Sequence, residues 1–441
     1  MKIKNTGKFV SLFTALTIAL CITGCSQNSN DNSGVSESES KTQTSTSSNN
    51  SPSDESKTEE SSVTEKDDVD KKDDEPIPEI SDPTPDNMGE TVEGVFIYNG
   101  VAYEMFYGSE GMAKYYADTV SEVKKGLGDN IKVYNVVVPT HVGVTLPEKF
   151  SDMCEPQDKY LNTIVNSYSA DVTGISAFDK LMHHRDEYIY FNTDHHWTAL
   201  GAYYAYRAFT SAAGIEPVKL EDLKEDKIEG YSGSLAYITG RDDLKEDYVT
   251  YYTSKNNIDC TKYDENGENP EDYMLIHSYA SGSNAYGVFL GGDTPILVTK
   301  NENGNGKKIA VLKESYGNAF SPFIAYTYSE AHLIDFRYVN IDLKSYLEKN
   351  GIDEVIIINN AMASATDARC EELKSLVSSS GETESSNDSY DDSGEENEYS
   401  DDPVYYDNDD ETDYYDEPDV DNEEDTNDYD DETYDDYNDE E

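Results

Sequence analysis

Basic residues are scarce in this sequence. The chain of 441 residues holds 33 Lys and Arg against 92 Asp and Glu, which gives a formal net charge of −59 at pH 7. A chain this acidic repels the phosphate backbone, which argues against nucleic acid binding. The imbalance is greatest at residues 381–441, where 31 residues are acidic and none is Lys or Arg. We expect self-repulsion to keep this Tyr-rich tail, residues 376–441, extended and disordered. Its role is open between solubilising the chain and binding cations or a basic protein.

Cysteine is also rare. Besides the two near the N-terminus, Cys154, Cys260 and Cys370 are widely spaced, and no Cys-x-x-Cys pair occurs. This spacing argues against a disulfide framework or a zinc-binding cysteine cluster, and one disulfide among the three stays open. The sequence also lacks a Walker loop, a Gly-x-Gly-x-x-Gly loop after a strand and a His-Glu-x-x-His pair. We therefore expect neither a cofactor nor a metal ion.

The N-terminal apolar run, residues 9–22, is too short to span a membrane comfortably and follows three lysines, a pattern typical of a secretory signal. The run ends in Ile-Thr-Gly-Cys, which resembles the bacterial lipobox. On that resemblance residues 1–25 are a lipoprotein signal peptide. Cys25 then carries lipid and anchors an extracytoplasmic protein to the bacterial cell membrane. The alternative is plain secretion with an incidental cysteine.

Large apolar side chains are almost absent between Ser26 and Met88. Such a segment cannot bury enough surface to offset the entropy of ordering, so residues 26–90 are predicted to be a disordered linker. The remainder, residues 91–375, is long enough for one sizeable domain. Within it, residues 215–305 alternate short β-type stretches with polar turns, which predicts a small mixed insertion that walls the site.

Buried strands alternate with helical patterns in this domain. Strands are expected at 131–139, 308–312, 331–336 and 353–360, and a helix that ends at Gly351 lies between the last two. This order predicts right-handed parallel crossovers and therefore a three-layer α/β/α fold around a parallel sheet. In such sheets the reactive groups lie beyond the carboxyl ends of the strands.

The stretch Asp194-His195-His196-Trp197-Thr198 combines acid and imidazole side chains before a helix with Thr198 as a plausible N-cap. In an extended entry segment, positions two apart face the same way, so Asp194 and His196 share a side. A carboxylate beside an imidazole fixes its tautomer, as in a Ser-His-Asp triad. A metal site that adds His183 and His184 is the alternative, but neighbours on a helix point about 100° apart and rarely bind one ion.

Ser315 could supply the nucleophile that such a pair needs. It lies between a buried strand and a helix, with Gly317 and Asn318 just after it. A sharp strand-to-helix turn exposes a serine hydroxyl, and the free amides of a helix N-terminus suit a developing oxyanion. From position alone, Ser315 could equally be only the N-cap of that helix.

The strings "TDHHWTALGAYYAY" and "VLKESYGNAFSPF" resemble the bacterial DHHW proteins, relatives of the alginate O-acetylation enzymes in the SGNH hydrolase superfamily. The resemblance covers about residues 91–375. It implies an SGNH-like fold in which Asp194 orients His196, His196 is the base and Ser315 is the nucleophile. Lys313-Glu314 stands where the superfamily usually has Gly-Asp before the serine.

The resemblance also implies oxyanion donors: the serine amide, a glycine amide and an asparagine side chain. The candidates are Gly292 and, at the end of a predicted strand, Asn359 and Asn360, which could also form a simple turn. Candidates for substrate contact are Trp197, which could stack on a sugar or lie in the core, Tyr316, and Arg337, which could instead form a surface ion pair.

Together these observations predict a cell-surface serine acyl-transfer enzyme, an O-acetyltransferase or acetylesterase. Its expected substrate is an envelope or extracellular polysaccharide or acylated sugar. The sequence does not distinguish addition of the acyl group from its removal. The alternative is a non-catalytic surface lipoprotein that keeps a degenerate SGNH fold and binds glycan or cations.

Overall fold

The computed structural model describes residues 71–378. The predicted signal peptide, the predicted lipidation site Cys25, most of the predicted linker and nearly all of the predicted acidic tail lie outside the described residues. Within 71–378 no helix has the length and apolar character that a membrane crossing requires.

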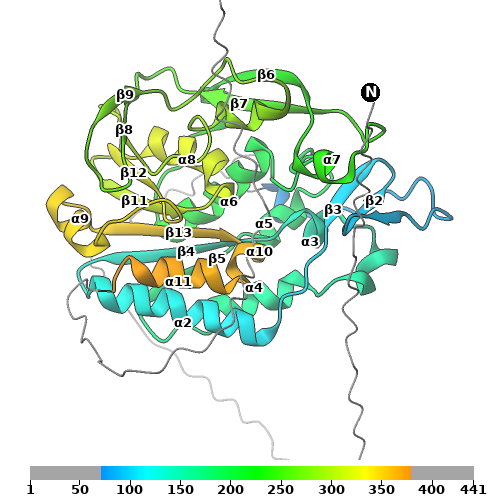
Figure 1. Ribbon diagram of the computed structural model, residues 1–441, viewed down its shortest axis with the longest axis horizontal. Coiled ribbons are helices and arrows are strands. Elements are labelled where there is room, and N and C mark those ends of the chain that lie inside the picture. The colour runs from blue at the N-terminus through cyan, green and yellow to red at the C-terminus, as the bar shows by residue number, and fades with distance from the viewer. Residues whose placement is uncertain (1–70, 379–441) are drawn as a thin grey trace, which may run out of the picture. The chain divides into compact units, whose positions relative to one another are not determined.

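An eight-stranded sheet runs through the centre of the described domain (Figure 1). Five neighbouring strands are parallel, and the remaining three are added antiparallel at one edge. In spatial order the strands are β5 (Val172–Ser176), β4 (Lys132–Val138), β13 (Glu354–Asn360), β11 (Lys308–Lys313), β12 (Glu330–Asp335), β10 (Ile296–Lys300), β8 (Asp259–Tyr263) and β9 (Glu271–Tyr273).

Helices cover both faces of this sheet (Figure 1). One face packs against α2 (Glu110–Leu127), α4 (Gln157–Val165), α9 (Leu343–Asn350) and α11 (Asp367–Ser375). The other packs against α6 (Ala199–Ala213) and α8 (Tyr316–Thr327). The central strands are apolar throughout because successive side chains alternate between two buried faces. In β13, Val355 and Ile357 face α2, whereas Ile356 and Ile358 face α8.

The predicted fold class is therefore confirmed, with a sheet that is mixed and mostly parallel. The predicted strands at 131–139, 308–312, 331–336 and 353–360 correspond to β4, β11, β12 and β13, and α9 ends at Gly351, whose φ is +66°.

The segment predicted as an insertion, residues 215–305, divides into two parts. Residues 224–253 form a separate hairpin, β6 (Lys224–Tyr231) and β7 (Asp247–Thr253), with α7 (Ser234–Thr239) between its strands. Residues 259–300 instead supply β8, β9 and β10 to the central sheet. β10 pairs with β12 and so satisfies backbone groups that an edge strand would leave open.

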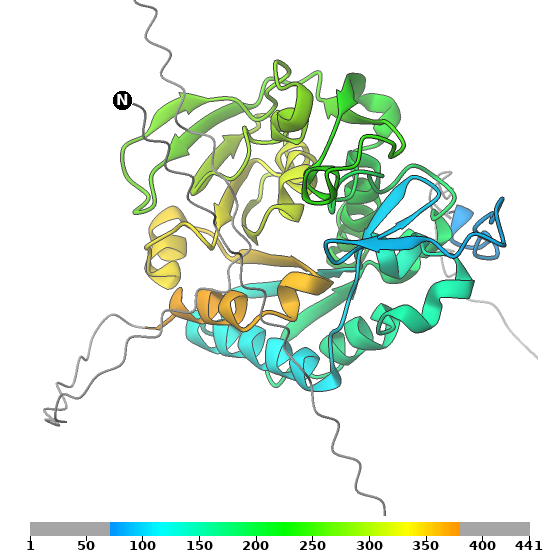
Figure 2. The same cartoon turned by 45° about the vertical axis from the view of Figure 1, so that its right-hand side comes forward.

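A small three-stranded sheet precedes the main one along the chain. It consists of β1 (Glu90–Val92), β2 (Val95–Tyr98) and β3 (Val101–Glu104), and β2 and β3 pack against α7 (Figure 2). Short helices complete the domain: α3 (His141–Thr145), α5 (Phe178–His183), α10 (Ala361–Ser364) and the 3₁₀ segments at Glu148–Met153, Leu220–Asp222 and Gly282–Val288.

Candidate active site

The turn between β11 and α8 places Ser315 at the carboxyl end of the central strands. β11 ends at Lys313 and α8 begins at Tyr316, so Ser315 occupies the N-cap position of the helix. Its side chain nevertheless makes no capping bond to the helix. The sequence left two roles open for this serine, the N-cap and the nucleophile. The hydroxyl does not act as a cap.

The Ser315 hydroxyl meets the imidazole of His196, from which it is 119 residues distant in sequence. Ser315 Oγ lies 2.8 Å from His196 Nε2, and His196 Nδ1 lies 2.7 Å from Asp194 Oδ1. A proton on Nδ1, directed at the carboxylate, leaves Nε2 as the acceptor for the hydroxyl. The structure thus brings together the three side chains that were predicted to act as a unit.

Asp194 lies in a shell of donors. Oδ1 also accepts from the backbone N–H of His196 (2.8 Å), and Oδ2 accepts from that of Ser234 at the start of α7 (2.8 Å). Burial alone would raise the pKa of Asp194, but the neighbouring His195 and His196 and these donors bring the pKa well below its usual range. The carboxylate therefore stays ionised and can stabilise an imidazolium.

Aromatic side chains fix the plane of the His196 ring. Tyr286 stacks on it with the ring centroids 4.1 Å apart and the planes 15° from parallel. The Tyr286 hydroxyl donates to the carbonyl of Ser315 (3.0 Å), so one side chain holds both the His196 ring and the Ser315 backbone. Sequence reasoning missed Tyr286, because it lies in an irregular 3₁₀ segment with no periodic pattern around it.

The donors available to an oxyanion lie beside Ser315. Among the described residues, the backbone N–H of Ser315 has no hydrogen-bond acceptor. The Asn360 Nδ2 group donates to Glu314 Oε1 (3.2 Å), while Asn360 Oδ1 accepts from the N–H groups of Met362 and Ala363 at the start of α10. These bonds fix the amide with its NH₂ group against Glu314, the residue before Ser315, and its second hydrogen has no acceptor among the described residues.

Two other oxyanion candidates do not fit. Asn359 lies on the opposite face of the sheet because side chains alternate along β13, and its Oδ1 accepts from the Tyr116 hydroxyl on α2 (2.7 Å). Gly292 already donates its backbone N–H to the carbonyl of Phe289 (3.1 Å). The structure therefore favours Asn360 over Asn359 and Gly292.

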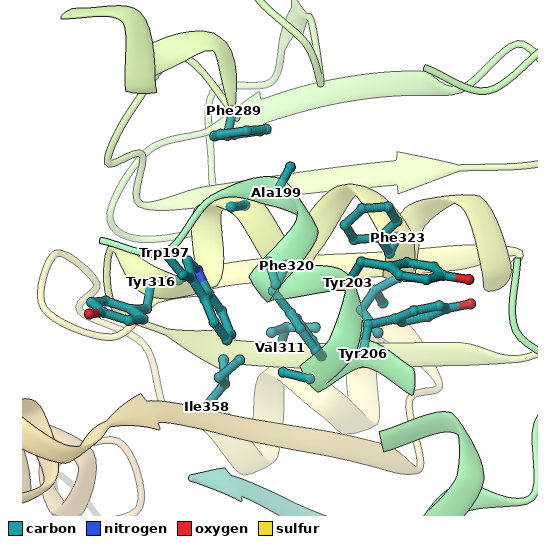
Figure 3. Close-up of a cluster of buried hydrophobic side chains, with 14 of the residues drawn as sticks. Trp197, Ala199, Tyr203, Tyr206, Phe289, Val311, Tyr316, Phe320, Phe323 and Ile358 are labelled. Carbon is teal, nitrogen blue, oxygen red and sulfur yellow. The ribbon is translucent and has the colours of Figure 1, made fainter. Parts of the chain in front are cut away.

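Trp197 and Tyr316 are core residues, in contrast to their prediction as substrate contacts (Figure 3). Their exposed fractions are 0% and 1%, and Trp197 Nε1 donates to the carbonyl of Tyr316 (2.9 Å). The Tyr316 hydroxyl donates to the carbonyl of His195. The two side chains thus support the segment that carries Asp194 and His196 from inside the domain.

Arg337 is engaged by two carboxylates. Its guanidinium contacts Asp335 through Nε (2.8 Å) and a terminal nitrogen (2.7 Å), and it also contacts Asp293 (2.7 Å). Asp335 in turn accepts from the fully buried Lys313 (3.0 Å). The prediction that Arg337 contacts an anionic or sugar group does not fit this placement, because the guanidinium is already neutralised.

A metal ion has one set of potential ligands in the described part of the chain: donor atoms of Asp194, His195 and His196 lie within 4.8 Å of one another. However, both nitrogens of His196 have partners in Asp194 and Ser315, and His195 Nδ1 lies 2.7 Å from Ser234 Oγ. His184 stacks on Tyr204 and does not join the group. This bonding pattern suits proton transfer between side chains.

Two solved structures share this fold, and a third matches more weakly. A crystal structure of a DHHW family protein from Eubacterium siraeum is 29% identical, with a TM-score of 0.61, and the similarity covers 65% of this chain and 97% of that one. Bacillus cereus PatB1 is 18% identical, with a TM-score of 0.52, over 62% of this chain and 98% of PatB1. The O-acetyltransferase domain of Pseudomonas putida AlgJ is more distant, at 12% identity and a TM-score of 0.38, over 64% and 98% of the two chains.

No curated protein has a matching sequence. The profile of the DHHW protein family matches residues 28–334, which is well over half of the chain. The chain therefore belongs to the DHHW protein family.

Proposed function

We propose that this protein is a serine acyl-transfer enzyme, an O-acetyltransferase or acetylesterase that acts on an envelope or extracellular polysaccharide. The observation that supports it most directly is the unbroken hydrogen-bond chain from Asp194 through His196 to Ser315. Such a chain activates a hydroxyl that is otherwise a weak nucleophile.

The first half-reaction forms an acyl-serine. Ser315 Oγ attacks the acyl carbonyl carbon while its proton passes to His196 Nε2, and Asp194 stabilises the resulting imidazolium. The oxyanion of the tetrahedral intermediate is placed against the Ser315 N–H and the Asn360 NH₂ group. When the intermediate collapses, the bond to the leaving oxygen breaks, and that oxygen takes the proton from His196.

The second half-reaction repeats these steps with a new hydroxyl. His196 takes a proton from the incoming oxygen, which attacks the acyl-serine and releases the Ser315 hydroxyl with the proton returned. If the incoming oxygen belongs to water, the enzyme is an esterase. If it belongs to a sugar, the enzyme is a transferase.

The DHHW proteins, which this chain resembles, are related to the alginate O-acetylation enzymes. This relationship supports the choice of acetyl groups and of a polysaccharide substrate. The proposed location fits this choice: a lipid-anchored, extracytoplasmic protein works where envelope and extracellular glycans are found. The lipobox-like sequence that ends at Cys25 supports that location.

Labelling with a fluorophosphonate tests the proposal, because this reagent modifies activated serines. We expect the label on Ser315, and we expect it to disappear in His196→Ala. Ser321→Ala is the matched control: Ser321 is buried on the same helix and donates only to the carbonyl of Gly317 (2.7 Å), so labelling should persist. A folded wild-type chain that takes no label would favour the non-catalytic binding protein.

A turnover assay then separates the two reaction types. The chain is supplied with p-nitrophenyl acetate, with and without an oligosaccharide acceptor. Acetylated oligosaccharide as the main product identifies a transferase, and free acetate in both cases identifies an esterase.

A further inference from the structure

A buried carboxylate outside the Asp194–His196–Ser315 triad is surrounded by five hydrogen-bond donors. Asp247, the first residue of β7, is 2% exposed. Its Oδ1 accepts from the Tyr188 hydroxyl (2.5 Å), from Asn192 N (2.9 Å) and from Asn192 Nδ2 (2.8 Å). Its Oδ2 accepts from Thr193 N (2.7 Å) and Thr193 Oγ1 (2.6 Å). Four of the five donors therefore belong to the two residues that directly precede Asp194.

The connection between the two strands of this hairpin, which contains α7, also bonds to these residues. The Thr193 carbonyl accepts from the N–H of Ala236 (3.0 Å), and Thr193 Oγ1 accepts from the N–H of Gly233 (3.0 Å). Asp194 Oδ2 accepts from the N–H of Ser234 (2.8 Å). Residues 192–194 are thus bonded both to α7 and its entry and to the start of β7.

We propose that Asp247 is the positioning residue of this site: its carboxylate fixes the backbone at Asn192 and Thr193 and thereby sets Asp194 against His196. Among the described residues its hydrogen bonds reach neither His196 nor Ser315, so it acts through the segment that it holds. The expected effect on catalysis rests on the proposed function. The expected effect on geometry does not.

The chemistry of the site requires a carboxylate at this position. An ionised carboxylate only accepts hydrogen bonds, which suits a set of partners made of donors alone. In Asp247→Asn one accepting oxygen becomes an NH₂ group of the same size. This group then faces either both Thr193 donors or the donors of Tyr188 and Asn192, and the segment must move to relieve the contact.

Two measurements on the full chain test the proposal. The first is the kcat and KM for p-nitrophenyl acetate. The second is the proton resonance of the His196 Nδ1–H group in protein labelled with ¹⁵N-histidine, assigned with His196→Ala. In Asp247→Asn we expect kcat to fall by about 10- to 100-fold with KM unchanged, because a displacement of about 1 Å costs that much in a positioned reaction. The Nδ1–H signal should be lost through exchange with water.

Asp226→Asn is the matched control, since Asp226 lies on β6 of the same hairpin and pairs with Lys224 near the surface (2.7 Å). It should leave kcat and the Nδ1–H signal unchanged. An Asp247→Asn protein with wild-type kcat and an unchanged signal would overturn the proposal. If the wild-type chain is inactive, the proposed function fails, and the His196 Nδ1–H signal alone tests the positioning role of Asp247. Loss of this signal in Asp247→Asn supports that role, and its retention overturns it.

A second variant covers the case in which Asp247→Asn does not fold, as judged by near-ultraviolet circular dichroism. Thr193→Val removes one of the five donors, together with the acceptor of the Gly233 N–H, and keeps the shape of the side chain. A smaller fall in kcat and a weakened Nδ1–H signal are expected. No change in either quantity would overturn the proposal.

Discussion

At the scale of single residues, Glu314 takes over the capping role that Ser315 does not fill. Ser315 Oγ lies 3.3 Å from Glu314 Oε2 and 2.8 Å from His196 Nε2, so the histidine is its nearer partner. Helix N-terminal amides need acceptors, and a serine at the N-cap usually supplies one. Here Glu314 Oε2 accepts from the N–H of Tyr316 (2.9 Å), and Oε1 accepts from the N–H (3.1 Å) and Nδ2 (3.2 Å) of Asn360. Glu314 therefore accepts hydrogen bonds from the backbone at the turn and also orients the Asn360 amide, the proposed oxyanion donor.

We predict that Glu314→Gln slows fluorophosphonate labelling of Ser315 by about 100-fold, the usual size of the loss when an oxyanion donor is misplaced. The reason is that the new NH₂ group faces either Tyr316 N–H or the Asn360 amide and displaces it. The measurement is the labelling rate at saturating reagent. Glu348→Gln, an exposed residue of α9, should label at the wild-type rate. Equal labelling rates for Glu314→Gln and Glu348→Gln would mean that the hydrogen bonds of Glu314 do not affect the reactivity of Ser315.

His141 is a second buried titratable residue, and it affects stability. Its ring lies between Tyr103 (4.6 Å between centroids) and Tyr190 (5.1 Å), and its Nδ1 has no partner among the described residues. Burial lowers the pKa of His141 to about 3. An unfolded chain has a histidine pKa of about 6.5.

The consequence is acid sensitivity with a defined sign. Between pH about 6.5 and about 3 the unfolded chain binds a proton at this position that the folded chain does not. The free energy of unfolding therefore falls by about 1.4 kcal/mol for each pH unit of acidification in this range. We predict that His141→Phe, which keeps the ring stacking, shows a smaller drop in urea midpoint from pH 7 to pH 4 than the wild type. An identical drop in both proteins would contradict this assignment.

At the scale of elements, α7 and the segment before His196 are in very close contact. A Cβ on Gly233 would lie 2.2 Å from Asp194 Cβ, closer than real side chains approach. The backbone of α7 can donate to Asp194 only because residue 233 has no side chain.

We therefore predict that Gly233→Ala displaces α7 or Asp194 and lowers kcat by at least about 10-fold, because the triad geometry depends on this contact. Gly111→Ala is the control, since its Cβ meets nothing nearer than 3.7 Å within α2. It should keep full activity and should gain slightly in thermal midpoint, because alanine favours a helix over glycine. Full activity in Gly233→Ala would show that α7 shifts to accommodate the new side chain and that Asp194 keeps its position.

The elements also show which parts of the site could be predicted from sequence. The β-branched runs and the Gly351 stop predict β4, β11, β12, β13 and α9, and these elements bring Ser315 to the carboxyl edge of the sheet. The D-x-H spacing and the family strings predict Asp194, His196 and Ser315 as partners. Their meeting follows from tertiary packing, since α6, which follows His196, packs against α8, which follows Ser315.

The remaining errors have physical causes. The choice between Asn359 and Asn360 depends on the strand register, and a shift of one residue exchanges the two faces. Trp197 and Arg337 have side chains that suit a glycan, but their burial and ion pairs follow from tertiary packing, which the local sequence does not report. Asp247 and Tyr286 hold the site through long-range contacts and leave no local motif.

At the scale of the whole molecule, the proposed chemistry is contained in residues 71–378. The triad, the oxyanion donors and Asp247 all lie in this part of the chain. This part is itself acidic, with 27 Lys and Arg against 50 Asp and Glu, so the tail is not the sole source of the negative charge.

We predict that deletion of residues 381–441 leaves the kcat of the chain and the labelling rate of Ser315 unchanged. The physical reason is that no described contact of the site requires these residues. The measurement compares the full and the shortened chain in the same buffer. A fall in labelling would assign the tail a direct part in the reaction and would favour its role as a binding segment.

The distance of 119 residues between the imidazole and the hydroxyl has a consequence for the life of the chain. Neither half is reactive alone, since an isolated serine is a poor nucleophile and an unoriented histidine does not activate it. Reactivity is therefore an all-or-none property of the finished fold. In the proposed enzyme, an unfolded chain is therefore expected to stay inert towards esters until the segments that carry His196 and Ser315 have come together.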